Sequence, residues 1–199
     1  MLAVFFGGFM SFEISMNKVL GLWRSGRHEL ALAEMVSWPT DWQSSAHALH
    51  LRALILVSLE RFEASLPLFD QVARVMPTAE VFCNHGNALK SIGNLEVALI
   101  CYKNALAIDS DFINAIHGMV AVYELQGEYN KAIGLLVRAL SKIKNSKLLY
   151  FLLANVFKTT GDYEAAERNF LLAIELDPSY YNATHNLAML YRARGAYGS

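Results

Sequence analysis

The side chains in this sequence that are able to do chemistry are histidines, cysteines and asparagines, and they do not form a catalytic motif. The chain contains no Gly-x-Ser-x-Gly turn, no phosphate-binding loop, no His-Glu-x-x-His metal motif and no dinucleotide-binding glycine pattern. Asp and Glu are scattered, mostly near expected turns and helix ends. We therefore expect a protein that is not an enzyme and that carries no cofactor.

The segment 147–180 shows which elements must position these side chains. Apolar residues recur at helical spacing on both sides of Gly161-Asp162, a pair that is typical of a turn. Asp177-Pro178 ends the second stretch, because the residue before a proline is disfavoured in the helical conformation. The segment is therefore predicted to be two amphipathic helices joined by a tight turn.

This helical hairpin repeats along the chain. Glycines at the expected turns are separated by 34 residues, and two sets of alanines keep the same step. Small residues let two helices approach closely, while larger apolar residues fill the grooves beside them. The repeated positions are Gly93, Gly127, Gly161 and Gly195; Ala98, Ala132 and Ala166; and Ala105, Ala139 and Ala173.

The repeated unit resembles the tetratricopeptide repeat family. The shared pattern is aromatic-x2-Leu-Gly/Ala-x2-aromatic, followed by Gly-x-Tyr and then by Ala, an aromatic residue, Ala and Pro. The resemblance covers nearly the whole chain after Phe12 and implies an all-α, right-handed α-solenoid of antiparallel helix pairs, with about 11 helices. In one repeat the matching residues are Tyr150, Leu153, Ala154, Phe157, Gly161, Tyr163, Ala166, Phe170, Ala173 and Pro178.

The repeats also predict the domain organisation. An apolar extension over residues 1–11 precedes a solenoid over residues 12–199. The repeat at 12–45 is degenerate, and 181–199 supplies a partial repeat with one unpaired helix. Complete repeats are expected at 46–78, 79–112, 113–146 and 147–180.

The repeat at 46–78 departs from the pattern in several places. Glu60 stands where other repeats have the turn glycine, and Val72 replaces an alanine. Pro67 lies inside the second helix, where we expect a local distortion because proline removes a backbone hydrogen bond. In the loop before this repeat, Asp41 is the expected helix N-cap.

The two ends of the chain are open to alternative interpretations. The stretch from Met1 to Phe12 is almost wholly apolar, is too short to span a membrane and lacks the positive charge of a signal peptide. We expect it to cover the open end of the solenoid; a membrane-associated or partner-binding tip is the alternative. The helix expected at 181–199 either caps the solenoid or leads into further repeats or a catalytic domain.

Composition narrows the class of partner. Hydrophobic residues make up 54% of the 199 residues, and 17 basic residues nearly balance 18 acidic ones. This balance does not indicate a surface for nucleic acid or for anionic lipid. Cys83 and Cys101 lack the spacing of a metal site and fit a reducing compartment. We expect a cytoplasmic protein.

The resemblance implies which side chains face a ligand, because the first helix of each repeat lines a concave groove in this family. The fifth positions of these helices carry three histidines, a cysteine and a phenylalanine. A shared metal ion is not expected, because packed helices lie about 8–10 Å apart while zinc ligands lie about 2.0–2.3 Å from one ion. A polar groove wall is the simpler interpretation for His50, Cys83, His117, Phe151 and His185.

Asparagines are the second set of candidates, because an amide offers a donor and an acceptor to a peptide backbone. O-linked N-acetylglucosamine transferases have a similar superhelix with an asparagine at the sixth position, which Asn84 and Asn186 match and other repeats do not. The carboxylate clamp of heat-shock cochaperones is not expected, since Cys83 and Phe151 stand where that clamp has lysines.

We therefore predict a non-catalytic scaffold that binds a peptide or a helix of a partner protein in the concave groove. The alternative is the N-terminal, substrate-recruiting region of a larger enzyme such as a glycosyltransferase or a sulfotransferase. Self-association through the terminal helices is a third interpretation. The predicted groove contacts are Asn84, Asn87, His117, Tyr123, Asn155 and Asn186.

Overall fold

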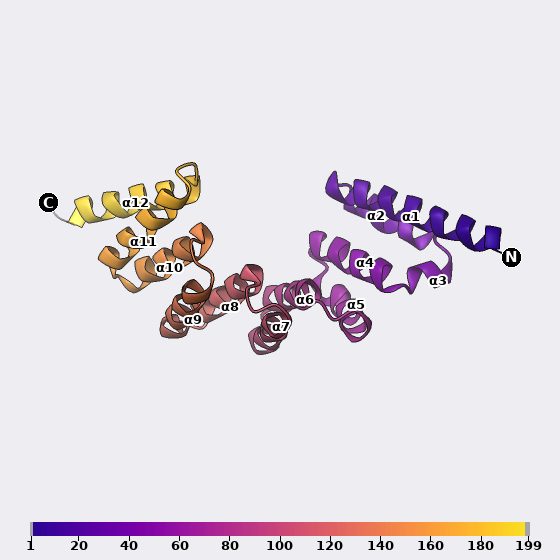
Figure 1. Cartoon of the computed structure of the whole chain (residues 1–199), viewed down its shortest axis with the longest axis horizontal. Coiled ribbons are helices and arrows are strands. Elements are labelled where there is room, and N and C mark those ends of the chain that lie inside the picture. Colours follow the sequence, from indigo (N-terminus) through magenta and orange to yellow (C-terminus); the bar gives the residue numbers. More distant parts are fainter. Residues whose placement is uncertain (1, 198–199) are drawn as a thin grey trace. The chain divides into compact units, whose positions relative to one another are not determined.

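The computed structural model describes the backbone of residues 2–197 and the side chains of residues 11–193. Within this range every regular element is a helix, as Figure 1 shows. The helices are α1 (Leu2–Arg24), α2 (His28–Val36), α3 (Thr40–Gln43), α4 (Ala46–Ser58), α5 (Phe62–Val75), α6 (Ala79–Ser91), α7 (Leu95–Ile108), α8 (Ile113–Leu125), α9 (Tyr129–Lys142), α10 (Lys147–Thr160), α11 (Tyr163–Leu176) and α12 (Tyr181–Tyr197).

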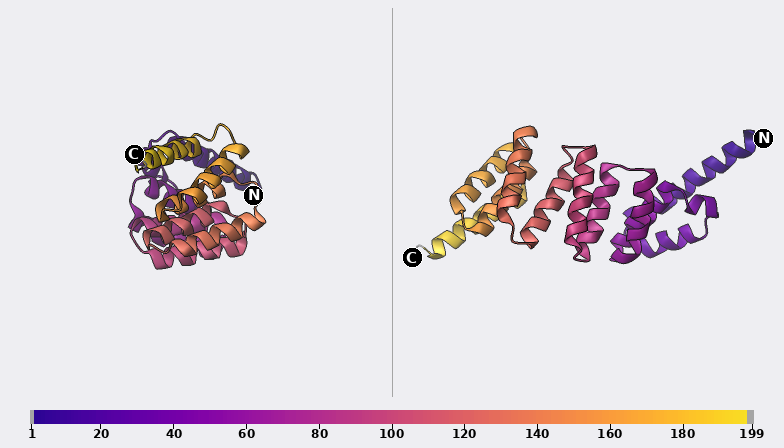
Figure 2. Two further views of the ribbon diagram at one scale, coloured as in Figure 1. Left: turned by 90° about the vertical axis from the view of Figure 1, so that its left-hand side faces the viewer. Right: turned by 90° about the horizontal axis from the view of Figure 1, so that it is seen from below.

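The chain divides into two compact units, Met1–Ile108 and Asp109–Ser199, which we call unit 1 and unit 2. In unit 1, α4 pairs with α5 and α6 pairs with α7; in unit 2, α8 pairs with α9, α10 pairs with α11, and α12 packs on α11 (Figure 2). These pairs confirm the predicted all-α solenoid class. The described residues form twelve helices instead of about eleven, because the single turn α3 precedes α4.

We call α4, α6, α8, α10 and α12 the first helices, and α5, α7, α9 and α11 the second helices. The alanines that repeat in the second helices are buried where each hairpin closes. Ala98, Ala132 and Ala166 have no exposed surface. In the second repeat Ser65 and Val72 take the place of alanines and are equally buried, and the Ser65 hydroxyl donates to the backbone oxygen of Phe62 at 2.7 Å.

The turn glycines have the backbone geometry that their spacing predicts. Gly26, Gly93, Gly127 and Gly161 all have positive φ angles, between 70° and 84°. A left-handed residue ends a helix because its backbone turns the chain away, and glycine adopts this conformation without a steric cost. Glu60 occupies the same place in the second repeat with φ at 57°.

Replacing Glu60 with glycine is therefore expected to stabilise unit 1. A non-glycine residue in the left-handed region carries a conformational cost of about 1 kcal/mol, and the side chain of Glu60 is exposed. The free energy of unfolding from urea titration should rise by up to about 1 kcal/mol. Glu63→Gly, inside the first turn of α5, is the matched control and should be destabilising. An unchanged or reduced stability for Glu60→Gly would contradict the expectation.

Two local predictions differ from the structure. Asp41 is not a helix N-cap, because it lies inside α3; the Ser45 hydroxyl caps α4 by accepting from the Ala48 backbone nitrogen at 3.3 Å. Gly195 is not at a turn, because α12 continues through it to Tyr197. Pro67 lies inside α5, and the local distortion expected there stays a prediction.

Residues 2–11 of the predicted apolar extension form the beginning of α1. The contacts of its first ten side chains lie outside the described residues. From Phe12 onward α1 packs against the core of unit 1, where the rings of Phe12, Trp38 and Trp42 meet edge to face at centroid distances of 5.2–6.4 Å. This aromatic cluster joins α1 to α3 and to the loop between α2 and α3.

Candidate functional site

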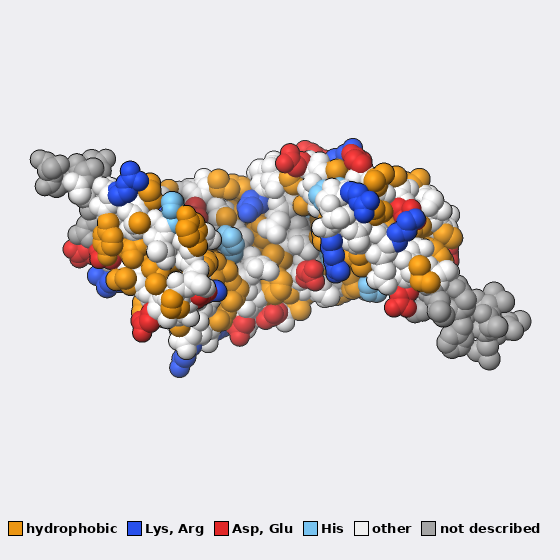
Figure 3. Space-filling model, turned by 90° about the horizontal axis from the view of Figure 1, so that it is seen from above, with side chains coloured by type: hydrophobic (Ala, Val, Ile, Leu, Met, Phe, Trp, Pro, Cys, Tyr) orange, Lys and Arg blue, Asp and Glu red, His pale blue; other side chains and the backbone are white. Residues whose placement is uncertain are grey.

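The predicted contacts fall in both units. Asn84 and Asn87 are half-buried on α6 of unit 1, whereas His117, Tyr123, Asn155 and Asn186 belong to unit 2. Figure 3 shows hydrophobic side chains mixed with histidines and cations on one face of the molecule.

In unit 1 the amide of Asn87 connects the two helices of its repeat. Its Oδ1 accepts from the hydroxyl of the buried Tyr102 at 2.8 Å, and its Nδ2 lies 4.0 Å from the sulfur of Cys83. Burial raises the pKa of Tyr102, so that its hydroxyl remains a donor. Asn87 therefore keeps one Nδ2 hydrogen and the second lone pair of its Oδ1 for a ligand.

The fifth position of α4 is part of a stacked cluster in unit 1. The ring of the buried Phe69 contacts His50 edge to face, with ring centroids 6.2 Å apart, and stacks on His85, with ring centroids 5.7 Å apart. The Nε2 atom of His50 is buried without a hydrogen-bond partner, and Nδ1 of His85 lies 3.9 Å from Asp70. Burial lowers the pKa of both histidines. The charge of Glu80 partly offsets this for His50, and that of Asp70 does so for His85. His47 lowers the pKa of His50 further.

Unit 1 is therefore expected to lose stability in acid. Between the lowered pKa in the folded state and the ordinary value of 6.5, the unfolded chain binds more protons, so stability falls as the pH drops below 6.5 and is fully present above it. Thermal unfolding followed between neutral and mildly acidic pH should show this loss. The double variant His50→Gln/His85→Gln should reduce the slope, and His28→Gln, a histidine on α2, should not. An equal slope in the double variant would contradict the assignment.

In unit 2 we define the first-helix face by polar and aromatic residues at helical spacing on α8, α10 and α12. α8 contacts α10 directly. A hydrogen bond of 2.7 Å from Nζ of Lys158 to Oδ1 of Asn186 joins α10 to α12. The residues of this face are Asn114, His117, Phe151, Asn155, Lys158, Asn182, His185 and Asn186.

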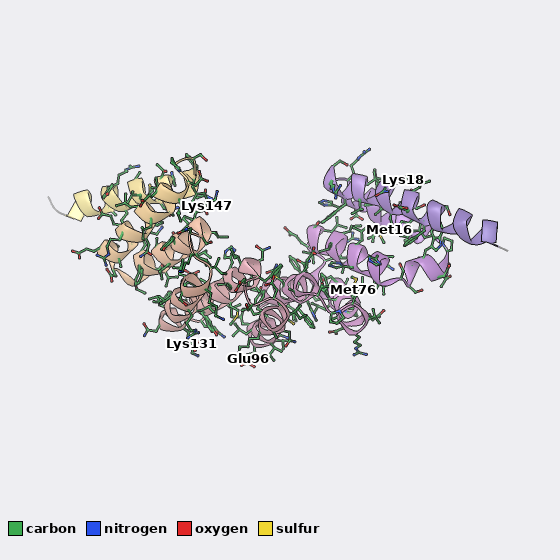
Figure 4. All side chains as sticks on the ribbon, in the orientation of Figure 1. Met16, Lys18, Met76, Glu96, Lys131 and Lys147 are labelled. Carbon is green, nitrogen blue, oxygen red and sulfur yellow. The ribbon has the colours of Figure 1, made fainter. Side chains whose placement is uncertain are left out.

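A half-buried aromatic residue lies at the N-terminal part of this face. The Phe151 ring packs against two other rings, with centroid distances of 6.0 Å to Phe170 and 5.4 Å to Tyr180. The Lys147 ammonium lies 5.3 Å from the centre of the Tyr180 ring and pairs with Asp177; Figure 4 labels Lys147 at the start of α10. Hydrogen bonds from Lys147 and from Ser179 lower the pKa of Asp177 to about 2.

The polar part of the face is ordered by side-chain hydrogen bonds. Nδ2 of Asn186 donates to the backbone oxygen of Asn182 at 2.9 Å, which turns its Oδ1 toward Lys158. Asn155 lies one helical turn before Lys158 on α10, so their side chains share one side of that helix. Sequence reasoning missed Lys158; the signal that could have found it is an Asn-x2-Lys sequence present in both α6 and α10.

The other two predicted contacts lie on α8. His117 is exposed, at the fifth position of the helix. Tyr123 is half-buried, and the Lys131 ammonium of α9 lies 5.9 Å from the centre of its ring.

In unit 2 a shallow pocket of about 330 Å³ lies beside the start of α9, the turn before it and the last residue of α10. The Lys131 ammonium, labelled in Figure 4, is paired with Glu128 there at 2.7 Å. The pocket is lined by Gly127, Glu128, Tyr129, Asn130, Lys131 and Thr160.

The described residues contain no group of three or more His, Cys, Asp or Glu side chains placed to hold a metal ion. Cys83 and Cys101 are free and buried, and burial raises the pKa of each thiol to about 11. Within the described part of the chain, no helix has the length and apolar character needed to cross a bilayer.

Comparison with known sequences identifies the repeated unit. Family models described as tetratricopeptide repeat match residues 79–112 and 149–180, and a second such model matches residues 115–148. The TPR repeat-containing protein YpiA of Bacillus subtilis (strain 168) is 28% identical over 91 residues, which cover 46% of this chain and 22% of YpiA.

Solved structures show the same fold at low sequence identity. TTC0263, a thermophilic TPR protein of Thermus thermophilus, has a TM-score of 0.70 at 19% identity, with 90% of this chain and 98% of TTC0263 covered. YrrB, described as a TPR protein with an unusual peptide-binding site, has a TM-score of 0.62 at 17% identity, with 86% and 89% covered.

Proposed function

Because the chain belongs to the tetratricopeptide repeat family, whose members are generally protein-interaction scaffolds, we propose that it is a non-catalytic scaffold that binds a peptide or a helix of a partner protein. The binding surface is formed by the first helices of the repeats. Asn84 and Asn87 contribute to it in unit 1, and His117, Tyr123, Asn155 and Asn186 contribute in unit 2.

The observation that carries this proposal is the composition of the first-helix face of unit 2. Phe151 offers a half-buried aromatic surface supported by Phe170 and Tyr180. Asn155 lies one turn further along the same helix, with the ammonium of Lys158 beyond it. An aromatic anchor next to groups that hydrogen-bond a peptide backbone is the combination that interfaces use for affinity and register.

The similarity to YrrB supports the same class of ligand, since that protein is described as having a peptide-binding site. The chain aligns with 89% of YrrB, so the comparison concerns the whole repeat array.

Site-specific photocrosslinking tests which surface binds the partner. A photoreactive amino acid replaces the exposed His117 on the first-helix face, or the exposed Leu171 on the second helix α11 as the matched control. The intact chain is then illuminated in cell extract and adducts are identified by mass spectrometry. We expect one dominant adduct from position 117 that is absent from position 171. Equal adducts at both positions, or none from position 117, would contradict the proposal.

A further inference from the structure

The Asn-x2-Lys sequence recurs in equivalent first helices of the two units. Asn87 and Lys90 lie on α6, and Asn155 and Lys158 lie on α10, two repeat periods further along the chain. Residues three apart share one side of a helix, and all four side chains are half-buried. Each unit thus presents one amide beside one ammonium group, which we call an Asn–Lys pair.

The charge of Lys158 is not neutralised inside unit 2. Its ammonium donates to the neutral amide oxygen of Asn186 at 2.7 Å, and no carboxylate of the described residues pairs with it. Lys131 and Lys147, in contrast, pair with Glu128 and Asp177. An ammonium group has three donor hydrogens, so Lys158 can accommodate a further, anionic acceptor.

Glu124 is the carboxylate at the position of α8 that is equivalent to Lys158. Burial raises the pKa of Glu124, and no cation within the described part of the chain opposes that rise. A nearby lysine would favour the charged carboxylate and lower its pKa. Glu124 is therefore not the counter-ion of Lys158.

The Asn–Lys pair in unit 1 also lacks a carboxylate partner among the described residues. Oδ1 of Asn87 accepts from the Tyr102 hydroxyl, and one Nδ2 hydrogen is directed to the Cys83 sulfur at 4.0 Å, so the second Nδ2 hydrogen is available to a ligand. Lys90 forms no ion pair with a carboxylate of the described residues, and Glu80 lies ten residues earlier on α6, about 15 Å along the helix axis. Both pairs therefore offer donor hydrogens and a positive charge that no carboxylate of the described residues neutralises.

We propose that a partner segment that binds either unit is acidic and that an Asp or Glu side chain binds at the Asn–Lys pair of that unit, its carboxylate accepting from one ammonium and one amide. Charge-assisted hydrogen bonds of this kind are the strong ones. Cys83 and Phe151 stand where the clamp for a C-terminal carboxylate has lysines, so the ligand groups are side chains. The half-buried Phe151, one turn before Asn155, selects an apolar residue beside the acidic one. This inference rests on the proposed peptide-binding function.

A random peptide library displayed on phage and selected on the intact chain supplies the probes. Selected sequences are synthesised with amidated C-termini and a fluorescent label, and their affinities are measured by anisotropy. We expect enrichment of Asp and Glu beside apolar residues. Lys158→Gln or Lys90→Gln should weaken binding about tenfold to a hundredfold, Lys158→Arg should retain most of the affinity, and added salt should weaken binding.

Lys142→Gln on α9 and Lys103→Gln on α7 are the matched controls on second helices, and circular dichroism confirms that every variant is folded. Neutral selected peptides that lose affinity with Phe151→Ala but not with Lys158→Gln would overturn this inference and leave the proposed function intact. Peptides that require a free C-terminus would also overturn it. Failure to select any peptide that is sensitive to first-helix variants would overturn both.

Discussion

Replacing Phe170 with alanine is expected to destabilise unit 2 by about 3–5 kcal/mol, the range for removing a fully buried aromatic side chain. Phe170 has no exposed surface and packs with Ala154, Ala166, Ala183 and Leu187 in the core of unit 2. The variant leaves a cavity among helices α10, α11 and α12. Urea unfolding followed by circular dichroism measures the loss.

Leu171→Ala provides the matched control, because Leu171 is the next residue on α11 and is 47% exposed. This substitution should change the free energy of unfolding by no more than about 0.5 kcal/mol. The loss of Phe170 should also reduce peptide binding, since its ring contacts Phe151 at 6.0 Å. Comparable destabilisation by the two substitutions would show that the core is not where the structure places it.

The second large effect is expected at Gly86, where no side chain fits. A Cβ atom at this position would lie 2.8 Å from Cε1 of Tyr102 and 3.0 Å from two other ring atoms. Tyr102 is fully buried and hydrogen-bonded to Asn87, so its ring cannot move aside freely. Gly86→Ala should therefore cost about 1–3 kcal/mol by overpacking, although glycine to alanine inside a helix normally stabilises.

Two other helical glycines are the controls. A Cβ atom at Gly21 would meet nothing within 4 Å, and one at Gly134 would meet only the end of the Arg138 side chain at 3.9 Å. Alanine at either position should stabilise the protein by up to about 1 kcal/mol. In a double-mutant cycle, Gly86→Ala combined with Tyr102→Leu should be less destabilising than the sum of the single variants. Additive effects would refute the steric explanation.

The contact between Gly86 and Tyr102 belongs to a core position that recurs in each repeat. Phe69, Tyr102, Leu136 and Phe170 occupy one repeat position and are all fully buried. The matching positions on the first helices carry Ala53, Gly86, Val120 and Ala154, so a small residue accompanies each of the three rings and a valine accompanies Leu136. Periodicity predicts that these positions face the core, because a repeated unit must bury the same side in each copy.

Sequence reasoning was less successful where one residue type has several uses. Asp41 and Ser45 are both acceptable helix N-caps, and only the position of the helix start at Ala46 selects Ser45. Gly195 keeps the spacing of the turn glycines but lies inside α12, because spacing fixes a position in the repeat and not its conformation. At Glu60 the turn conformation is present without a glycine, because a glutamate adopts the positive φ angle there.

The sequence by itself determined the fold class and the family, because a helical period repeated every 34 residues leaves few other ways to bury the apolar side chains. Only the tertiary structure decided which polar side chains are already occupied. Asn87 and Asn186 are sequence candidates of the same kind, yet one accepts from Tyr102 and the other from Lys158. Hydrogen-bond partners come from neighbouring helices, and a linear pattern records the face of one helix without the chemistry of the helix beside it.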